Sequence, residues 1–507
     1  MKRPQKFAII LLSATIATSA LTGCQSTNHA QIDVEQKTQV QQASIKKPKY
    51  IFLFIGDGMS HTQVNAAQVY NGTIANKDKV ELEKLGFTQF PVVGNVTTQD
   101  STSFVPDSAS TATSIAGGVK THSGVIGLHA DKTTKTETIA EKLKKDGYKV
   151  GIVSSVTLNH ATPAAFYAHT ESRGNYYDIA KQMSESNFDY FAGGALDSSK
   201  GEDEKQKDAY EILKEKGYNV INNKEEILAL DNSSEKVYAI NPELQGGAME
   251  YDIDSDKDSL VLKDFVKKGI DVLDNDKGFF MMVESGKVDW AGHANDAKSN
   301  IGDTIAFDEA IAEAVEFYNE NPEDTLILVT GDHETGGMSI GQATTGYDTA
   351  FDLLQNQKIS YEAFDELLNK FKEENKNAKL KDVLPMIKEN FGLMTKDDKD
   401  ASKKESEMLV LSDYEYKKLE QSFKETMKDA DKREETTENE ILYGGYEPLT
   451  VTLTHILNNK AGIGWTSYSH TGVPVPLYAK GINEEMFNGS YDNTDIFNKL
   501  VEMCGLK

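Results

Sequence analysis

The stretch YIFLFIGDGM, residues 50–59, leads an uncharged apolar run directly into a turn in which Asp57 lies between two glycines. Three further short runs are also mostly apolar, at residues 149–153, 279–283 and 325–329. Such runs are typical of buried strands in a parallel sheet. The segments between them show the three- and four-residue apolar spacing of amphipathic helices, at residues 138–145, 260–273 and 304–318. This alternation predicts an α/β fold, a three-layer sandwich with a central, mostly parallel β-sheet flanked by helices.

The composition is that of an acidic globular protein. The 507 residues include 54 Lys and Arg against 80 Asp and Glu, a formal net charge of −26, and 38% of them are hydrophobic. This balance disfavours nucleic-acid binding, wholesale disorder and a membrane protein with many spans. It offers no electrostatic steering of anions, so an anion site must be a local exception built from metals or arginine. The two cysteines, Cys24 and Cys504, lie in contexts too different to predict a disulfide framework.

The N-terminus has the features of a bacterial export signal. Three basic residues among the first six precede an uncharged, mostly apolar stretch at 7–21, which is too short for a stable spanning helix. The stretch ends in LTGC at 21–24, which resembles the lipobox of bacterial lipoproteins. We expect a lipoprotein signal peptide at 1–23, a lipid anchor at Cys24, a flexible tether at 24–48, and an exported protein held on the extracytoplasmic side of a membrane. An ordinary signal peptide with an incidental cysteine is the alternative.

A charged block interrupts the α/β pattern. Residues 351–440 contain 23 acidic and 17 basic side chains, and three amphipathic helices are predicted within them, at 361–371, 382–391 and 412–427. We expect a helical insertion that serves as a lid or an interface, with the catalytic domain formed by 49–350 and 441–507. The alternative is a set of solvated helices with no role in the chemistry.

Several apolar runs end in turns that carry acidic or histidine side chains. In open α/β sheets, ligands bind beyond the carboxyl ends of the strands, so these turns are the candidate site. Asp289 and His293 are four residues apart and share one face of a helical turn, so both can bind one metal ion. Further candidates of the same kind are Asp57, Glu284, Asp332, His333 and His470. The set favours zinc, whereas Asp57, Glu284 and a hydroxyl suit magnesium; taken singly, each residue could instead be structural.

Ser108 is the candidate nucleophile. It opens a run of small residues that predicts a helix through Ala116, ended by two glycines. At a helix N-terminus, the free N–H groups and the helix dipole favour a serine alkoxide or a bound phosphate. The alternative is that Ser108 is the N-cap, a common role for serine.

Taken together, these residues resemble the alkaline phosphatase family, in order, from Tyr50 to Gly505. The matching elements are GDGM at 56–59, DSA at 107–109, HATPAA at 160–165, Ser172-Arg173, the segment 284–293, DH at 332–333 and HTG at 470–472. No single motif is decisive, but the ordered series is highly specific.

The resemblance implies a role for each residue. Ser108 would be the nucleophile, and Arg173 would grip two phosphate oxygens with its planar fork. The implied ligands are Asp289, His293 and His470 for a first zinc, Asp57, Asp332 and His333 for a second, and Thr162 and Glu284 with Asp57 for magnesium. The implied enzyme is a homodimer with two Zn²⁺ and one Mg²⁺ per subunit. It would hydrolyse varied small-molecule phosphate monoesters through a phosphoserine and release inorganic phosphate.

At two positions near the site the chain departs from some family members. It has His160 and Trp290 where those members carry Asp and Lys. A tryptophan cannot supply the positive charge of a lysine, so we expect phosphate to be held less tightly and released faster. The alternative is that Trp290 only packs the rim.

Two other functions compete with this prediction. The first is a phosphodiesterase or sulfatase on the related two-metal scaffold, although the sulfatase pattern Cys/Ser-x-Pro-x-Arg is missing around Ser108. The second is a non-catalytic lipoprotein that binds phosphate or zinc. Binding alone needs metals and Arg173 but no nucleophile, so Ser108 discriminates between them.

Overall fold

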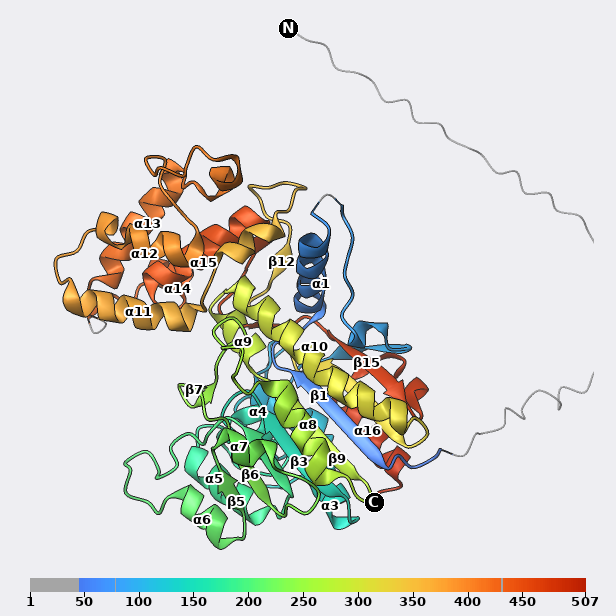
Figure 1. Ribbon diagram of the computed structural model, residues 1–507. Helices are drawn as coiled ribbons and strands as arrows, with labels where there is room; N and C mark the ends of the chain where they lie inside the picture. Colours follow the sequence, from blue (N-terminus) through green and yellow to red (C-terminus); the bar gives the residue numbers. More distant parts are fainter. Residues whose placement is uncertain (1–44, 78, 430–431) are drawn as a thin grey trace, which may run out of the picture. The chain divides into compact units, whose positions relative to one another are not determined.

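The computed structural model describes residues 45–77, 79–429 and 432–507, and a ten-stranded sheet forms the centre of the body (Figure 1). The strand order is β16-β2-β15-β10-β1-β9-β3-β4-β6-β5. Within this sheet only β15 runs antiparallel to its neighbours β10 and β2, so the mostly parallel sheet is confirmed. The strands are β1 (Tyr50–Gly56), β2 (Val92–Thr97), β3 (Lys149–Ser154), β4 (Tyr190–Gly193), β5 (Asn219–Ile221), β6 (Val237–Ile240), β9 (Phe279–Ser285), β10 (Thr325–Gly331), β15 (Val475–Gly481) and β16 (Gly489–Asp492).

The four predicted apolar runs are four adjacent strands at the middle of this sheet, β10, β1, β9 and β3. Every residue of β1, β9 and β10 is buried, as expected for strands covered on both faces. In the parallel register, Gly56 pairs with both Ser285 and Gly331. The carboxyl ends of three strands are therefore level, and the polar turns that follow them begin at one edge of the sheet.

Side chains of β1 alternate between two apolar cores, one on each face of the sheet. Phe52 and Phe54 belong to one core, and Ile51 and Leu53 belong to the other. The first face is covered by α1 (His61–Ala75), α8 (Leu262–Leu273) and α10 (Ala297–Glu320), and Figure 1 shows α8 and α10 running alongside β1 and β9. The second face is covered by α2 (Ser108–Gly117), α3 (Ile139–Lys145) and α16 (Thr494–Cys504). The three-layer sandwich is confirmed.

The charged block folds into helices, drawn in orange in Figure 1. These are α11 (Tyr361–Glu374), α12 (Leu380–Phe391), α13 (Asp413–Thr426) and α14 (Thr437–Tyr443), and the chain then returns to the body in α15 (Pro448–Ala461). Phe364, Ile387 and Phe423 of these helices are buried in the same apolar core as Phe52. The apolar face of the insertion is therefore continuous with the core of the body, while its charged face is solvated.

The shorter elements complete the fold around the sheet. They are α4 (Ala161–Ala164), α5 (Tyr176–Glu185), α6 (Ala209–Glu215), α7 (Lys224–Leu228), α9 (Lys287–His293), β7 (Leu244–Gln245), β8 (Ala248–Met249), β11 (Glu334–Thr335), β12 (Ser339–Ile340), β13 (Ile463–Gly464) and β14 (His470–Thr471). The strands β11 and β14 pair antiparallel, and this pairing brings the turn after β10 next to His470.

The N-terminal predictions fall mainly on residues beyond those described. The signal peptide at 1–23, the anchor Cys24 and most of the tether at 24–48 lie outside the described residues. Pro48 is already buried, and the hydroxyl of Tyr148 donates a 2.6 Å hydrogen bond to its carbonyl. Among the helices that the structure describes, none combines the length and the apolar character needed to cross a membrane. Cys504 is a buried free thiol, and burial raises its pKa to about 12.

Candidate active site

The turn after β1 is held close to two other strand ends. The backbone N–H of Gly58 donates a 3.1 Å hydrogen bond to Oδ1 of Asp332, which follows β10. Gly58 has φ of 72°, and a Cβ at this position would lie 2.9 Å from the Cα of Asp289. Only glycine combines this backbone conformation with such close packing, so the glycine lets Asp57 and Asp289 face one site.

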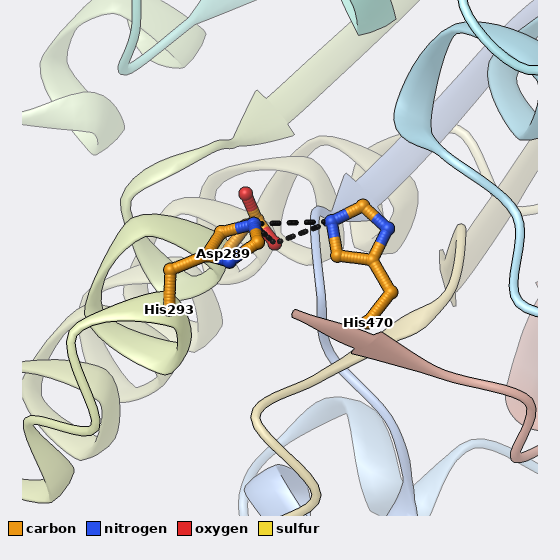
Figure 2. Close-up of side chains that lie close together, drawn as sticks. All are labelled: Asp289, His293 and His470. Atoms are coloured by element: carbon orange, nitrogen blue, oxygen red, sulfur yellow. Dashed lines mark hydrogen bonds and ion pairs between the residues drawn. The ribbon is translucent and has the colours of Figure 1, made fainter. Parts of the chain in front are cut away.

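Asp289, His293 and His470 form the first cluster (Figure 2). The Nε2 atoms of the two imidazoles are 3.1 Å apart, and Oδ1 of Asp289 lies 3.4 Å from one and 3.5 Å from the other. Asp289 and His293 come from one face of α9, as their spacing predicted, and His470 comes from β14. Burial alone would raise the pKa of Asp289, but the imidazoles of His293 and His470 outweigh it, and the pKa lies below its usual range.

The imidazoles of this cluster present lone pairs to its centre. Nδ1–H of His293 donates to the carbonyl of Tyr468 at 2.6 Å, and Nδ1–H of His470 donates to the carbonyl of Pro106 at 2.7 Å. In the neutral form of each ring this bond places the proton on Nδ1, so the Nε2 lone pairs of the two rings face each other. Two such lone pairs at 3.1 Å beside a carboxylate fit a divalent cation between them.

Asp57, Asp332 and His333 form the second cluster, and all three side chains are fully buried. Nε2 of His333 lies 3.3 Å from Oδ1 of Asp57 and 3.2 Å from Oδ2 of Asp332. Its Nδ1 is 3.3 Å from the hydroxyl of Thr335, which donates a 2.5 Å hydrogen bond to Asp289. Since that hydroxyl already donates, His333 is the donor to it through Nδ1–H, and its Nε2 lone pair faces the carboxylates.

Ser108 lies against the second cluster. Its Oγ is 3.1 Å from Nε2 of His333 and donates to Oδ1 of Asp57 at 3.4 Å. It is the first residue of α2, and the N-cap is Asp107, whose carboxylate accepts from the N–H of Ser110 at 3.0 Å. The structure thus excludes the alternative that Ser108 caps the helix, and its hydroxyl is free to act at the helix N-terminus.

Asp57, Glu284 and His160 form the third cluster. Thr162, predicted as a ligand here, donates from its hydroxyl to Oδ2 of Asp57 at 3.3 Å. His160, which was expected near the site, belongs to this group by distance. Oε1 of Glu284 and Nδ1 of His160 are buried without a hydrogen-bond partner, whereas the other Glu284 oxygen accepts from Ser154. The unpartnered oxygen of Glu284 beside the shared carboxylate of Asp57 fits a third cation. Nδ1 of His160 does not offer a lone pair, because Nε2 of the same ring accepts from Arg173 and the ring proton is therefore on Nδ1.

The buried carboxylates of the site would be stabilised in their ionised form by positive charge. Burial, together with the neighbouring carboxylates, raises the pKa of Asp57. Burial raises the pKa of Glu284 to about 8 and, with Asp289 nearby, that of Asp332 to about 7. Burial also lowers the pKa of His333, which keeps its imidazole neutral at physiological pH. These carboxylates are difficult to ionise while no positive charge is nearby. Cations bound among them would favour the ionised form.

Arg173 lies at the edge of the site, with its side chain 29% exposed. Its Nη1 donates to Oδ2 of Asp107 at 3.0 Å, and its Nη2 donates to Nε2 of His160 at 3.1 Å. Burial would lower the pKa of Arg173, but the carboxylate of Asp107 more than offsets this and raises it. The guanidinium therefore remains charged beside Asp107, the residue before Ser108, where it can bind an anion.

Sequence reasoning missed two hydroxyl residues that orient the ligands. Thr335 contacts both Asp289 and His333, and Thr111 donates to Oδ2 of Asp332 at 3.0 Å. Thr335 stands two residues after His333 and Thr111 one helical turn after Ser108, but threonine is too common in turns and helices for spacing alone to mark it. In contrast, every predicted metal ligand lies in one of the three clusters or donates to one.

Comparison with known proteins agrees with this geometry. The sequence profile of the family "Alkaline phosphatase" matches residues 48–506. Alkaline phosphatase 3 of Bacillus subtilis is 29% identical over 98% of this chain and 96% of its own. A cold-active alkaline phosphatase from Shewanella sp. has a TM-score of 0.72 at 27% identity, covering 90% of this chain and 99% of that one. A TAB5 alkaline phosphatase mutant, with histidine replaced by glutamate and Mg bound in the M3 site, has a TM-score of 0.60 at 25% identity, covering 91% and 99%.

The ordered clusters, the free serine and the match across nearly the whole described body agree with one another. The chain belongs to the alkaline phosphatase family, and it is a metal-binding phosphatase.

Proposed function

We propose that the chain hydrolyses phosphate monoesters through a phosphoserine formed on Ser108. The observation that carries this proposal is the free Ser108 hydroxyl at the N-terminus of α2, in contact with His333 and Asp57 of the second cluster. A protein that only binds phosphate or zinc does not need a buried serine hydroxyl at that position, because Asp107 already caps the helix.

Arg173 and the start of α2 bind the phosphate, and Ser108 attacks it. Arg173 grips two oxygens of the phosphate, and the N–H groups at the start of α2 face the same anion. The Ser108 oxygen forms a bond to phosphorus while the bond from phosphorus to the ester oxygen breaks, and the alcohol leaves with a proton. Water then attacks the phosphoserine in line, which releases phosphate and restores the Ser108 hydroxyl. Cations held by the three clusters would supply the positive charge that activates both nucleophiles and stabilises the departing oxygen.

We assign zinc to the first and second clusters, as the resemblance implied, and magnesium to the third. The imidazole nitrogens of His293, His470 and His333 suit the borderline Zn²⁺ ion. The carboxylates of Asp57 and Glu284 with the Thr162 hydroxyl suit Mg²⁺, and the TAB5 mutant with Mg in its M3 site supports a magnesium site in this family. Metal analysis of the purified protein tests the assignment, with two zinc and one magnesium ions expected per chain.

Replacing Arg173 with alanine should raise KM for a monoester by about 10- to 100-fold, the range for a lost charge-assisted hydrogen bond to a buried anion. The inhibition constant of inorganic phosphate should rise in parallel, because product and substrate share the contact. Arg173→Lys keeps the charge but not the fork, so its values should fall in between. Steady-state kinetics with phosphate as inhibitor measures both constants. Unchanged KM and phosphate inhibition in Arg173→Ala would remove Arg173 from the phosphate site.

A substrate panel tests the reaction class. The protein, reloaded with zinc and magnesium after chelation, is offered a chromogenic phosphate monoester, its diester and its sulfate analogue. We expect the monoester to be hydrolysed fastest, at alkaline pH and with dependence on both metals. Preference for the diester would make the chain a phosphodiesterase of the same superfamily, and phosphate binding without turnover would make it a binding protein.

We also propose that the protein is exported, is anchored through a lipid on Cys24, and acts as a homodimer on the extracytoplasmic side of a membrane. The LTGC sequence at 21–24 supports the anchor, and family membership supports the dimer. Labelling cells with a palmitate analogue tests the anchor, because Cys24→Ala should abolish incorporation while Cys504→Ala should not. Light scattering of the purified protein tests the dimer.

A further inference from the structure

A buried lysine connects the helical insertion to the helix that carries two metal ligands. Lys287 is the first residue of α9, and its side chain is 0% exposed. Its Nζ lies 3.2 Å from Oε2 of Glu362, which belongs to α11 of the insertion (Figure 1). Lysine is almost never fully buried unless it is paired, and a buried pair that loses one member leaves an uncompensated charge. The contact therefore joins α11 firmly to α9.

The same ammonium group lies over two aromatic rings. Nζ of Lys287 is 4.0 Å from the ring centroid of Tyr251 and 4.8 Å from that of Trp290, both within the range of cation–π attraction. Trp290 is three residues further along α9, one turn from Lys287. A positive charge thus exists beside Trp290 after all, but it is supplied by Lys287 and is balanced by Glu362.

Trp290 in turn contacts His160, which is hydrogen-bonded to Arg173. Its ring packs edge to face against His160, with centroids 6.0 Å apart and an interplanar angle of 76°. Nε2 of His160 accepts the 3.1 Å hydrogen bond from Nη2 of Arg173. An unbroken series of contacts therefore runs from Glu362 through Lys287, Trp290 and His160 to Arg173.

The insertion also contacts the start of α10, which follows α9 directly in the chain. Asp296 lies three residues beyond His293, and it is fully buried. Its two carboxylate oxygens accept from Nε2 of Gln357 at 2.9 and 2.8 Å, and one of them accepts from the N–H of Tyr361 at 3.0 Å. Residues 357–362 of the insertion thus contact Lys287 at the start of α9 and Asp296 at the start of α10.

We propose that Lys287 is a positioning residue of the phosphate site, which uses its ion pair with Glu362 to hold Trp290 against His160 and so to fix the orientation of Arg173. The start of the insertion is then part of the active-site scaffold and not only a solvated addition to it. This inference rests on the proposed phosphatase function, because its consequence is the affinity for phosphate. It goes further in naming residues that touch neither substrate nor metal.

The test compares Lys287→Met with other variants. They separate an effect on the orientation of Arg173 from a general weakening of the contact between the insertion and the body. We expect Lys287→Met to raise both KM for a monoester and the inhibition constant of inorganic phosphate by about tenfold, with kcat within threefold, because a misdirected Arg173 weakens a charge-assisted hydrogen bond to phosphate. Glu362→Gln should act in the same direction, and Lys287→Arg, which keeps the charge, should stay within threefold of the parent. The two further variants keep the test open if Lys287→Met does not fold.

Lys460→Met is the matched control. Lys460 of α15 pairs with Glu415 of α13 at 3.0 Å, and the two side chains are 14% and 18% exposed, so this pair also joins the insertion to the body without touching α9. We expect its KM and phosphate inhibition to stay within twofold of the parent. Equal effects of Lys460→Met and Lys287→Met on phosphate affinity would overturn the proposal, as would unchanged phosphate affinity in both Lys287→Met and Glu362→Gln.

A second readout does not depend on turnover. The chain has two tryptophans, so Trp465→Phe leaves Trp290 as the only fluorophore of its kind. In that background, Lys287→Met should make Trp290 more accessible to acrylamide quenching, and Lys460→Met should not. If the parent protein does not hydrolyse monoesters, the proposed function fails while the quenching result still tests the contact. If quenching is unchanged by Lys287→Met, the positioning role is wrong whatever the activity.

Discussion

Replacing Ser108 with alanine should lower kcat for a phosphate monoester by at least about 10⁴-fold, the scale on which enzymes lose activity when their nucleophile is removed. The reason is geometric, since Ser108 Oγ is the hydroxyl 3.1 Å from His333 and 3.4 Å from Asp57, at a helix N-terminus capped by Asp107. No partner other than these two side chains holds that oxygen in the structure's described residues. Stopped assays with a sensitive chromogenic ester measure the residual rate.

Ser114→Ala is the matched control in the same helix. Its Oγ donates to the carbonyl of Ser110 at 2.9 Å, a local bond inside α2 that leaves the site untouched. We expect Ser114→Ala to keep kcat within threefold of the parent, and Ser108→Ala to retain the metal content and the fold. A Ser108→Ala protein with more than a tenth of the parental kcat would show that another group attacks phosphorus.

Removing the metals should destabilise the protein by at least about 4 kcal/mol, the linkage expected for a ligand present at a thousand times its dissociation constant. The cause lies in the buried carboxylates of Asp57, Glu284 and Asp332, which repel one another when no cation separates them. Denaturant unfolding of the loaded and the chelated protein, at one pH and one protein concentration, measures the difference.

The pH dependence of the chelated protein follows from the same groups. Glu284 with a pKa of about 8 and Asp332 with a pKa of about 7 lie above their unfolded values, so the native state binds more protons than the unfolded state between about pH 4 and pH 8. The unfolding free energy of the chelated protein should therefore fall as the pH rises through that window, by about 2 kcal/mol or more between pH 5 and pH 8. Glu284→Gln should flatten the slope. A chelated protein equally stable at both pH values would contradict this account of the site.

The centre of the fold could be predicted because its strands are buried on both faces. The short, mostly apolar runs in β1, β3, β9 and β10 have the length of strands, and so they predict buried strands. The outer strands could not be predicted in the same way. β4 and β6 have four residues each, too few to show a period. β15 contains Pro476, which cannot donate a backbone hydrogen bond and argues against a strand inside a sheet.

Helix boundaries depended on caps that the apolar spacing does not reveal. The helix predicted from residue 304 begins at Ala297 instead, because Asp296 is its N-cap and accepts from the N–H of Ser299 at 3.1 Å. The helices predicted from 361 and 412 lie where expected, since Ser360 and Ser412 cap them.

Most of the site followed from the rule that ligands bind at the carboxyl ends of parallel strands. That rule brings together Asp57, Glu284 and Asp332 as soon as three adjacent strands are recognised. It cannot foresee contacts between segments that the sheet does not align, such as His160 beside Glu284 or Lys287 beside Glu362. Those depend on how loops and the insertion pack, which local sequence does not determine.

The most direct test of the central claim is to trap the phosphorylated enzyme. The metal-loaded protein is mixed with a monoester, quenched in acid and digested, and the peptides are analysed by mass spectrometry. We predict one phosphoryl group on the peptide that contains Ser108, absent from Ser108→Ala and from the chelated protein and unchanged in Ser114→Ala. Monoester turnover without a phosphoserine at Ser108, or with phosphate on another residue, would contradict the account.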